Sequence, residues 1–274
     1  MEWREEAGVR WLEADLGGAR AAFTTRLGGV SEPPFDRLNL GLLTDDDPAA
    51  VRTNRGRVAE ALGIPPHRIV FGRQVHAAEL AFHAAADSGA RSRGSFGTDY
   101  VPKEPGDLND PPEVDGHVVA APGLAPLVFT ADCLPVALAG PGGVAMLHCG
   151  WRGLAAGIVA RGAEAVGATD AAIGPAIGPC CYEVGPEVPT AFADLGQGIA
   201  ADGPNSRPGL DISARRHLDL PEVARRLLRR AGVERVELAG LCTSCEAELF
   251  FSHRRDAGRT GRQGGLVWIE PEEG

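Results

Sequence analysis

Short apolar runs recur along the chain and predict most of its β-structure. Most of them are rich in valine, isoleucine and alanine and do not alternate cleanly with polar residues, which is typical of strands covered on both faces. They predict strands over residues 19–25, 68–71, 116–121, 125–130, 136–139, 144–148, 171–177, 236–241 and 266–269. The pattern therefore predicts a layered α/β fold.

Helical patterns lie between these strands. Asp47 followed by Pro48 forms an N-cap and first-turn pair, after which apolar residues recur at near-helical spacing until Gly63. An alanine-rich stretch over 154–166 ends at a glycine, and so does an apolar-periodic stretch over 221–231. We expect a helix in each place, each linking two strands.

Two stretches without apolar periodicity predict loops. Residues 84–113 are rich in glycine, proline, serine and charge, so they cannot bury a face and indicate an exposed insertion. Residues 196–210 predict a second, shorter loop. Because strand-like sequence continues on both sides of each, we expect one domain over residues 1–274.

Composition excludes several classes of protein. The hydrophobic fraction of 44% and the charged fraction of 23% are ordinary for a folded chain. A net charge of −10 opposes binding to nucleic acid or anionic lipid, and the arginine pairs at 225–226 and 229–230 fall on a predicted helix as a solvated face. Neither nucleic acid nor membrane is expected as a partner.

The longest apolar region, 117–149, is interrupted by Asp132, four prolines and several glycines, which argues against a membrane span. The N-terminus is charged from its second residue and has no apolar segment of a secretory signal. We therefore expect a cytoplasmic protein.

Six cysteines are too few for a disulfide scaffold in a chain of this length, so they are core thiols, nucleophiles or ligands. Cys242 and Cys245 form a CxxC pair, but no second such pair completes a four-thiolate site. Cys180 and Cys181 are adjacent, and their side chains would point to opposite faces of a strand. We expect a structural role for the CxxC pair rather than a catalytic one.

Three candidate metal ligands follow or end predicted strands. His76 lies after the strand at 68–71, Cys133 after the strand at 125–130, and His148 closes the strand at 144–148. Two imidazoles and a thiolate suit Zn²⁺ or copper, and three protein ligands leave one coordination position open, as in catalytic sites. Taken singly, a histidine at a strand end is more often a hydrogen-bonded structural residue, and a buried cysteine is more often a small hydrophobic residue.

A family resemblance brings these residues together. The stretch VAMLHCGWRGLAAG (144–157) resembles the HAGWRG turn of bacterial proteins known as laccase-like or multicopper polyphenol oxidases, which are now regarded as purine nucleoside phosphorylases and are also called peptidoglycan editing factors. Further matching motifs occur in family order: TTRLGGVS (24–31), LNLG (38–41), QVH (74–76), TADCLPV (130–136), GPAIGPCCYEVGPEV (174–188) and ELFFSHRRD (248–256). The resemblance runs from about residue 20 to the C-terminus.

The resemblance implies that His76, Cys133 and His148 bind zinc and form the catalytic centre. It implies phosphorolysis of adenosine, inosine or 5′-methylthioadenosine to the base and ribose 1-phosphate, with adenosine deaminase activity besides. It also implies mixed β-sheets packed in layers and flanked by helices, in a fold like the cysteine hydrolase fold of cytotoxic necrotizing factor, and a homodimer.

Four residues are candidates for binding phosphate or substrate. Arg152, beside Gly150 and Gly153, either docks an anion or pairs with a core carboxylate. Arg26 either holds phosphate or anchors a loop, Arg254 supplies a second cation or a structural ion pair, and Asn39 is a polar contact.

Two carboxylates and one further thiol lie near the expected site. Asp132 either orients a ligating histidine or acts as a general base. Asp115 is a candidate for a polar role there, whereas His117 is expected to be a strand residue. Cys149 stands where the resemblance has alanine, and is either an extra ligand or an oxidation liability.

Three alternative functions remain open. Copper-dependent phenol oxidation needs many histidine ligands, and the chain has seven histidines. A peptidoglycan-precursor editing enzyme is a second alternative. A binding protein with a structural zinc site is a third, and it predicts that removing the metal unfolds the chain.

Overall fold

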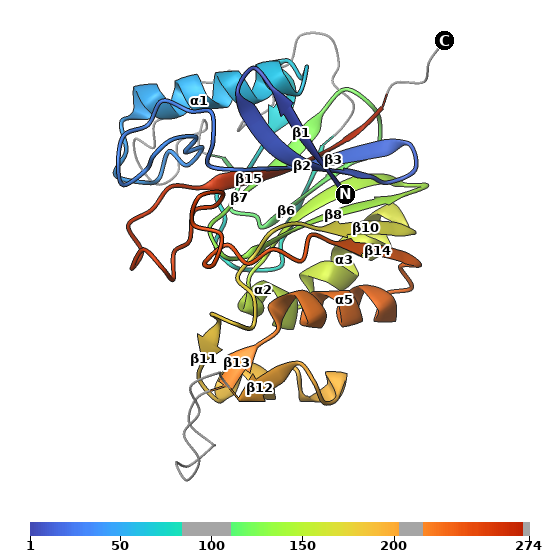
Figure 1. Cartoon of the computed structure of the whole chain (residues 1–274). Helices are drawn as coiled ribbons and strands as arrows, with labels where there is room; N and C mark the ends of the chain where they lie inside the picture. Colours follow the sequence, from blue (N-terminus) through green and yellow to red (C-terminus); the bar gives the residue numbers. More distant parts are fainter. Residues whose placement is uncertain (84–110, 203–215, 271–274) are drawn as a thin grey trace.

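Two mixed β-sheets lie face to face in the middle of the molecule, with α1 on one side and α3 and α5 on the other (Figure 1). The structure is a computed structural model and describes residues 1–83, 111–202 and 216–270. The first sheet has the order β1 (Glu2–Glu6), β2 (Val9–Asp15), β3 (Ala19–Thr24), β15 (Gln263–Ile269), β7 (Ala125–Thr130) and β4 (Ile69–Val70).

The second sheet has the order β14 (Arg235–Leu238), β10 (Asp170–Ile173), β8 (Leu134–Gly140), β9 (Gly143–Cys149), β6 (Gly116–Val119) and β5 (Leu80–His83). A small third sheet joins β11 (Glu183–Val184), β13 (Arg216–Leu218) and β12 (Ala200–Asp202). The helices are α1 (Pro48–Ala61), α2 (Trp151–Ala155), α3 (Ile158–Val166), α4 (Glu187–Thr190) and α5 (Leu220–Arg230), with 3₁₀ turns at Pro66–Arg68 and Ala193–Leu195.

Every strand predicted from the apolar runs is present, and the layered α/β fold is confirmed. Pairing is mostly antiparallel: within the two large sheets of the described chain, only β4 with β7, β5 with β6 and β10 with β14 pair in parallel. The predicted strands lack alternation of apolar and polar residues because both of their faces are buried, and not because they pair in parallel. The prediction missed β1, whose residues are all exposed, the more polar β2, and the short strands β5, β11 and β13.

Alternate residues of the central strands enter different cores. In β8, Leu134, Val136 and Leu138 pack toward α3 and α5, whereas Ala137 and Ala139 face the first sheet. A third cluster lies between the first sheet and α1. Burying each large apolar side chain contributes about 1.5–3 kcal/mol, so these cores hold the layers in place.

The predicted helices are present, with one correction. Asp47 caps α1 by accepting a hydrogen bond from the Ala49 amide at 2.9 Å. The stretch predicted as one helix over 154–166 is two, because the chain becomes helical at Trp151 and Gly157 breaks the run with a φ of 86°.

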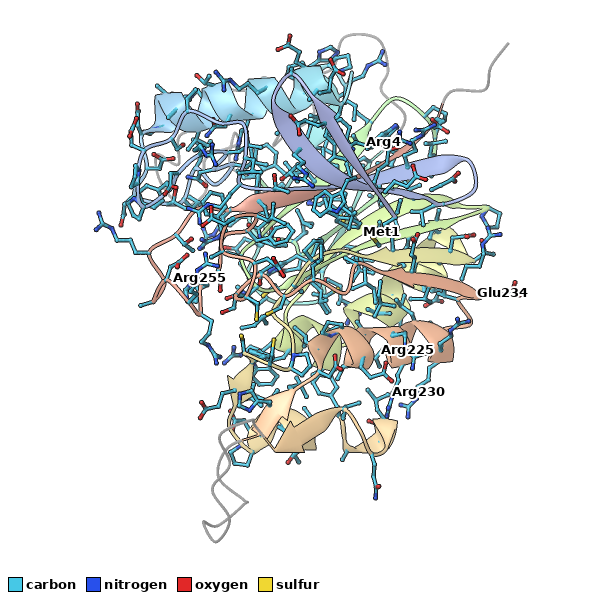
Figure 2. All side chains as sticks on the ribbon, viewed as in Figure 1. Met1, Arg4, Arg225, Arg230, Glu234 and Arg255 are labelled. Atoms are coloured by element: carbon cyan, nitrogen blue, oxygen red, sulfur yellow. The ribbon has the colours of Figure 1, made fainter. Side chains whose placement is uncertain are left out.

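Helix α5 begins after the Asp219 cap and carries the predicted basic pairs at its surface. Figure 2 shows Arg225 and Arg230 extending from this helix. Glu222 pairs with Arg225 and Arg226, and Arg230 pairs with Asp194, which confirms a solvated, ion-paired face.

The predicted loops fall partly outside the described residues. Of the 84–113 insertion only residues 111–113 are described, and residues 203–210 of the second loop are also outside. In the described part of that loop, residues 196–199 are irregular as predicted, but the prediction was wrong for Ala200–Asp202, which forms β12. In the described chain, every helix is too short or too polar to span a bilayer.

Candidate metal centre and its pocket

The register between β8 and β9 brings Cys133 and His148 together. Leu134 pairs with Cys149 and Pro135 with His148, so Cys133, the residue directly before β8, lies near His148, the last residue but one of β9. Side chains alternate along β9, so His148 points to one face while Cys149 points into the core on the helix side. Two ligands separated in sequence thus become neighbours by strand pairing.

His76 reaches the same place on a turn after β4. Its backbone has a φ of 60°, a left-handed conformation that few non-glycine residues adopt. The carboxylate of Asp115 accepts hydrogen bonds from three consecutive amides, those of Val75, His76 and Ala77, at 3.1, 3.0 and 2.8 Å. This buried carboxylate holds the turn in the conformation that presents His76.

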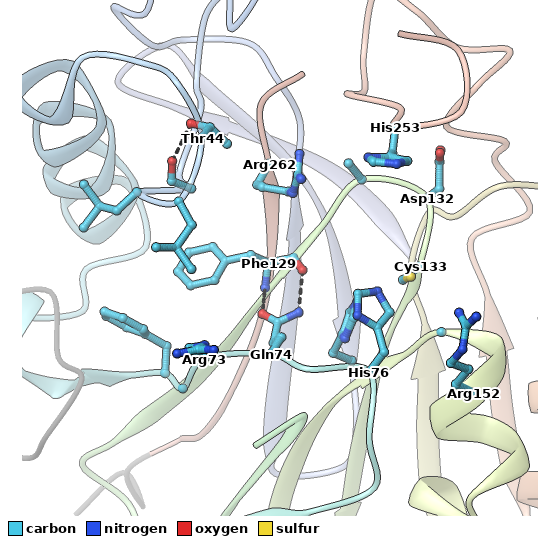
Figure 3. Close-up of a pocket in the computed structure, with 18 of the residues that line it drawn as sticks. Thr44, Arg73, Gln74, His76, Phe129, Asp132, Cys133, Arg152, His253 and Arg262 are labelled. Atoms are coloured by element: carbon cyan, nitrogen blue, oxygen red, sulfur yellow. Dashed lines mark hydrogen bonds between the residues drawn. The ribbon is translucent and has the colours of Figure 1, made fainter. Parts of the chain in front are cut away.

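Gln74 ties the same turn to the first sheet. Its side-chain amide donates to the Phe129 carbonyl and accepts from the Phe129 amide, both at 2.7 Å (Figure 3). The QVH motif therefore contains one residue that fixes the turn and one that is presented by it.

The three candidate ligands converge. One ligand atom each from His76, Cys133 and His148 lies within 4.8 Å of the other two. The rings of His76 and His148 lie 4.8 Å apart and nearly perpendicular, at 76°. Two imidazole nitrogens and one sulfur in this arrangement fit Zn²⁺ with a fourth position left for water or substrate.

The glycines of the GWRG turn are needed for close approach rather than for positive φ. Gly150 has a φ of −76°, but a Cβ there would lie 3.1 Å from the His76 ring and 3.2 Å from the Cys133 sulfur. A Cβ on Gly153 would lie 2.8 Å from the Ala77 carbonyl. The turn is thus packed directly against the ligands.

The charges of Cys133 and His148 stabilise each other. Burial alone would raise the pKa of the Cys133 thiol, but the His148 charge and hydrogen bonds from both histidines lower it to about 6. Burial alone would lower the pKa of His148, but the Cys133 charge and the Asp115 hydrogen bond raise it to about 9. The metal-free site therefore favours a thiolate beside an imidazolium.

Asp115, rather than Asp132, orients a ligating histidine. Its carboxylate lies 2.7 Å from Nδ1 of His148, which leaves Nε2 to face the site. Burial raises the pKa of Asp115, but the hydrogen bonds from His148 and the Ala77 amide outweigh it and lower the pKa overall.

Asp132 has a different set of partners. It accepts from the Thr243 hydroxyl and the Arg254 amide, each at 2.7 Å. Asp132 therefore joins the loop before Cys133 to two C-terminal segments, and among the described residues it forms no hydrogen bond with His76 or His148.

A pocket of about 460 Å³ opens beside the three ligands. Figure 3 shows Arg152, Arg262 and His253 around the space next to Cys133 and His76. Arg152 stacks on the Trp151 ring at 4.5 Å, and no carboxylate of the described chain pairs with it. Its guanidinium is thus available to an anion.

Arg254 also lines the pocket, over the Tyr182 ring at 5.3 Å and with one nitrogen donating to the Glu183 carbonyl. Arg26 and Asn39 are not among the described residues that line it. Arg26 donates to the Asp36 and Ala247 carbonyls and pairs with the Asp36 carboxylate.

Asn39 is fully buried and hydrogen-bonds Thr44, Asp46 and the Arg262 amide. Of the four predicted residues, Arg152 and Arg254 therefore line the pocket, whereas Arg26 and Asn39 form hydrogen bonds that connect loops outside it.

Sequence reasoning missed Arg55, Arg262 and Tyr182, which also line the pocket. Arg55 lies on the buried face of α1, with Val51 and Val58, and burial lowers the pKa of both Arg55 and Arg262. For Arg55, the sequence did contain a signal: a charged residue that lies at helical spacing between apolar residues of the buried face.

Cys149 and His117 are core residues. Burial raises the pKa of the Cys149 thiol, and its side chain belongs to the core under α3. His117 lies in β6 as predicted, buried, with Nδ1 3.0 Å from Nε2 of His83, and burial lowers its pKa to about 3. Neither belongs to a candidate ligand cluster in the described part of the chain.

Comparison of the sequence with known families finds one matching almost the whole chain. The family model described as "Multi-copper polyphenol oxidoreductase laccase" matches residues 20–270. A purine nucleoside phosphorylase of Pseudomonas aeruginosa is 37% identical, covering 95% of this chain and 98% of the relative. The purine nucleoside phosphorylase YlmD of Geobacillus stearothermophilus is 39% identical, covering 92% of each.

Solved structures agree with the fold. The hypothetical protein YfiH of Bacillus licheniformis has a TM-score of 0.82 and 33% identity, covering 98% of this chain and 99% of its own. The structure of YlmD from Geobacillus stearothermophilus has a TM-score of 0.79 and 34% identity over the same shares. The layered mixed sheets are therefore common to these proteins.

Proposed function

Since this chain belongs to the multi-copper polyphenol oxidoreductase laccase family, which has relatives named purine nucleoside phosphorylase, we propose that it is a zinc-dependent purine nucleoside phosphorylase. Its substrates are adenosine, inosine and 5′-methylthioadenosine, with phosphate as the second substrate. Residues 1–274 form one such domain, which acts in the cytoplasm.

One observation carries this proposal: three ligand atoms from distant segments converge at a pocket in which Arg152 and Arg254 form no ion pair with a carboxylate of the described residues. A structural zinc site would have four protein ligands and no access, whereas three ligands beside a pocket of nucleoside size suit catalysis. When bound, Zn²⁺ supplies a Lewis acid at an open position, chemistry that suits both polarisation of a substrate oxygen and hydrolytic deamination of adenosine.

The residues of the chain have separate roles in this proposal. His76, Cys133 and His148 hold the metal, and Asp115 keeps the proton of His148 on Nδ1 so that Nε2 can coordinate. Arg152 and Arg254 neutralise the phosphate that attacks C1′ of the ribose. The purine leaves C1′ with the electrons of the glycosidic bond, and the phosphate oxygen takes its place.

The aromatic side chains lining the pocket provide the surface for the purine base. Phe129 and Tyr182 both line it, and a flat aromatic base gains contact area and favourable stacking from such rings. Zinc is favoured over multicopper chemistry because several copper ions need more histidine ligands than the two that converge here among the described residues.

The proposal is tested by incubating the purified protein with each of the three nucleosides, with and without phosphate, and measuring base release. Release should require phosphate. Cys133→Ala and His148→Ala should each lose at least about 100-fold in activity, since even the outer partner of a metal ligand costs about 10–100-fold.

Cys149→Ala is the matched control, because it removes a buried thiol next to His148 that points into the core. It should retain activity. Equal base release by wild type, Cys133→Ala and His148→Ala would show that the proposed site is not catalytic. Binding of several copper ions per chain, with a blue absorption band, would favour phenol oxidation instead.

A further inference from the structure

Four cysteines from two distant segments meet on the surface, outside the pocket lining. Cys180 and Cys181 come from the segment before β11, and Cys242 and Cys245 from the segment after β14. All four are free thiols, and one sulfur from each lies within 4.8 Å of the other three.

The expectation that Cys180 and Cys181 point to opposite faces is wrong, because they lie in a turn and not in a strand. The amides of Cys181 and Tyr182 both hydrogen-bond the Gly178 carbonyl at 3.0 Å, and β11 begins only at Glu183. In this turn the sulfurs of both cysteines approach Cys245, at 3.4 and 3.5 Å.

The spacing of the sulfurs suits one metal ion. Zn²⁺ binds four thiolates tetrahedrally at about 2.3 Å, which places the sulfurs about 3.8 Å apart. The observed separations of 3.4 and 3.5 Å, and 4.8 Å at most, bracket this value. Small side-chain rotations of exposed cysteines are enough to complete the tetrahedron.

The turn that carries Cys242 and Cys245 receives a backbone donor at one sulfur. The Gly178 amide donates to the Cys242 sulfur at 3.2 Å. The Cys245 amide closes the turn onto the Cys242 carbonyl at 3.2 Å. Amide donors stabilise a thiolate, the form that binds metal.

We propose that Cys180, Cys181, Cys242 and Cys245 form a second metal site, a tetrathiolate site for Zn²⁺. Four sulfur ligands fill the coordination sphere, so the ion is structural, unlike the ion held by His76, Cys133 and His148. Binding releases the thiol protons that the ligands still carry.

The site joins a segment that lines the pocket to a segment that holds the loop before Cys133. Tyr182, which directly follows Cys181, lines the pocket, and Thr243, between the other two cysteines, donates to Asp132 beside Cys133. Arg255 donates to the Thr243 carbonyl at 2.9 Å, next to Arg254. If the proposed function is correct, loss of this ion raises KM for nucleoside while the catalytic centre keeps its own metal.

Metal content separates the two sites without any activity measurement. The full chain, purified under reducing conditions and loaded with Zn²⁺, should hold about two ions, as measured by mass spectrometry of the metal. The double variant Cys180→Ser/Cys245→Ser and the single variant Cys133→Ala should each hold about one. Cys149 belongs to neither cluster, so Cys149→Ala should still hold about two ions.

Cobalt gives a second measurement, which is made first on the wild type and then on the variants. Metal-free wild type titrated with Co²⁺ should show the intense visible bands of tetrahedral tetrathiolate coordination, and Cys133→Ala should keep them. The double cysteine variant should lose them while its circular dichroism stays unchanged.

The proposal is overturned if wild type holds only one ion and Cys180→Ser/Cys245→Ser does not change that number. It is also overturned if the reduced chain takes up no second ion and mass mapping finds a disulfide among the four cysteines. Failure of phosphorolysis would leave both metal counts unaffected, so the two proposals fail separately.

Discussion

The Asp115 carboxylate gives the sharpest test of how the metal centre is built. Its Oδ1 accepts from the His76 amide at 3.0 Å and lies 2.7 Å from Nδ1 of His148. Its Oδ2 accepts from the Val75 and Ala77 amides at 3.1 and 2.8 Å. Asp115→Asn preserves size but replaces one oxygen with an NH₂ group, so two of these four donors must lose their acceptor.

Either orientation of the asparagine is unfavourable. If the NH₂ replaces Oδ2, the backbone amides of Val75 and Ala77 in the His76 turn lose their acceptor. If it replaces Oδ1, it donates to Nδ1 of His148 and moves the ring proton to Nε2, the nitrogen that should bind metal. Hydrogen bonds to a charged group contribute about 1.5–3 kcal/mol each, so losing two destabilises the metal-free protein by about 3 kcal/mol or more.

Metal affinity should fall together with stability. Removing the partner of a ligating histidine costs about 10–100-fold in affinity, or about 1.4–2.8 kcal/mol. Zinc affinity at the centre is measured by competition with a chelator in the Cys180→Ser/Cys245→Ser background, and stability by urea unfolding of the metal-free chain.

Asp219→Asn is the matched control for Asp115→Asn. Asp219 caps α5 by accepting from the Glu222 amide, and asparagine caps a helix equally well. This control should change neither zinc affinity nor the urea midpoint by much. Zinc affinity within twofold of wild type in Asp115→Asn would refute the reasoning.

Three further changes test the pocket and the scaffold. Gly150→Ala places a Cβ 3.1 and 3.2 Å from two ligand side chains and should lower activity roughly 10–100-fold. Gly157→Ala has a φ of 86° and nothing within 4 Å of its Cβ, so it should lower the free energy of unfolding in urea by only about 1 kcal/mol. Equal activity in the two variants would contradict this expectation. Arg152→Gln should raise KM for phosphate about 10-fold or more and leave KM for nucleoside unchanged in steady-state assays, and an equal rise in both would argue against phosphate binding. The hydrogen bond from Arg225 lowers the pKa of Glu222 to about 2, so its contribution is present above the unfolded pKa of about 4.3 and is lost as pH falls toward 2. The difference in unfolding free energy between wild type and Glu222→Gln should therefore be largest near pH 7, at about 1 kcal/mol or less, and disappear near pH 2; a difference that does not change with pH would exclude the ion pair as its source.

Much of the secondary structure follows from the sequence, because its signals are local. The Asp47 cap and the glycines that end α3 and α5 act within one turn of the chain, and apolar runs mark strands wherever they occur. The failures are also local in origin. The fully exposed β1 has no apolar signal, and Gly157 breaks a helix only because its backbone adopts a positive φ.

The positions of the candidate ligands at strand ends could be read from the sequence, but only the family resemblance implied that they converge, and the residue pattern itself did not. Their convergence depends on the pairing of Leu134 with Cys149 and on a turn that Asp115 holds from 39 residues away. A local sequence pattern does not predict this register, because the register depends on which faces of distant strands are buried against each other.

Tertiary structure alone decided the roles of similar residues. Arg26 and Arg152 both stand beside glycines in the sequence, yet one is bound to backbone carbonyls and the other is open to the pocket. Likewise, Cys180 and Cys181 join Cys242 and Cys245 only because a turn, and not a strand, carries them. The sequence determines the chemistry of each side chain, but the fold determines its partners. Thr243 and Asp132, for example, are more than a hundred residues apart in the chain and form a hydrogen bond only in the folded protein.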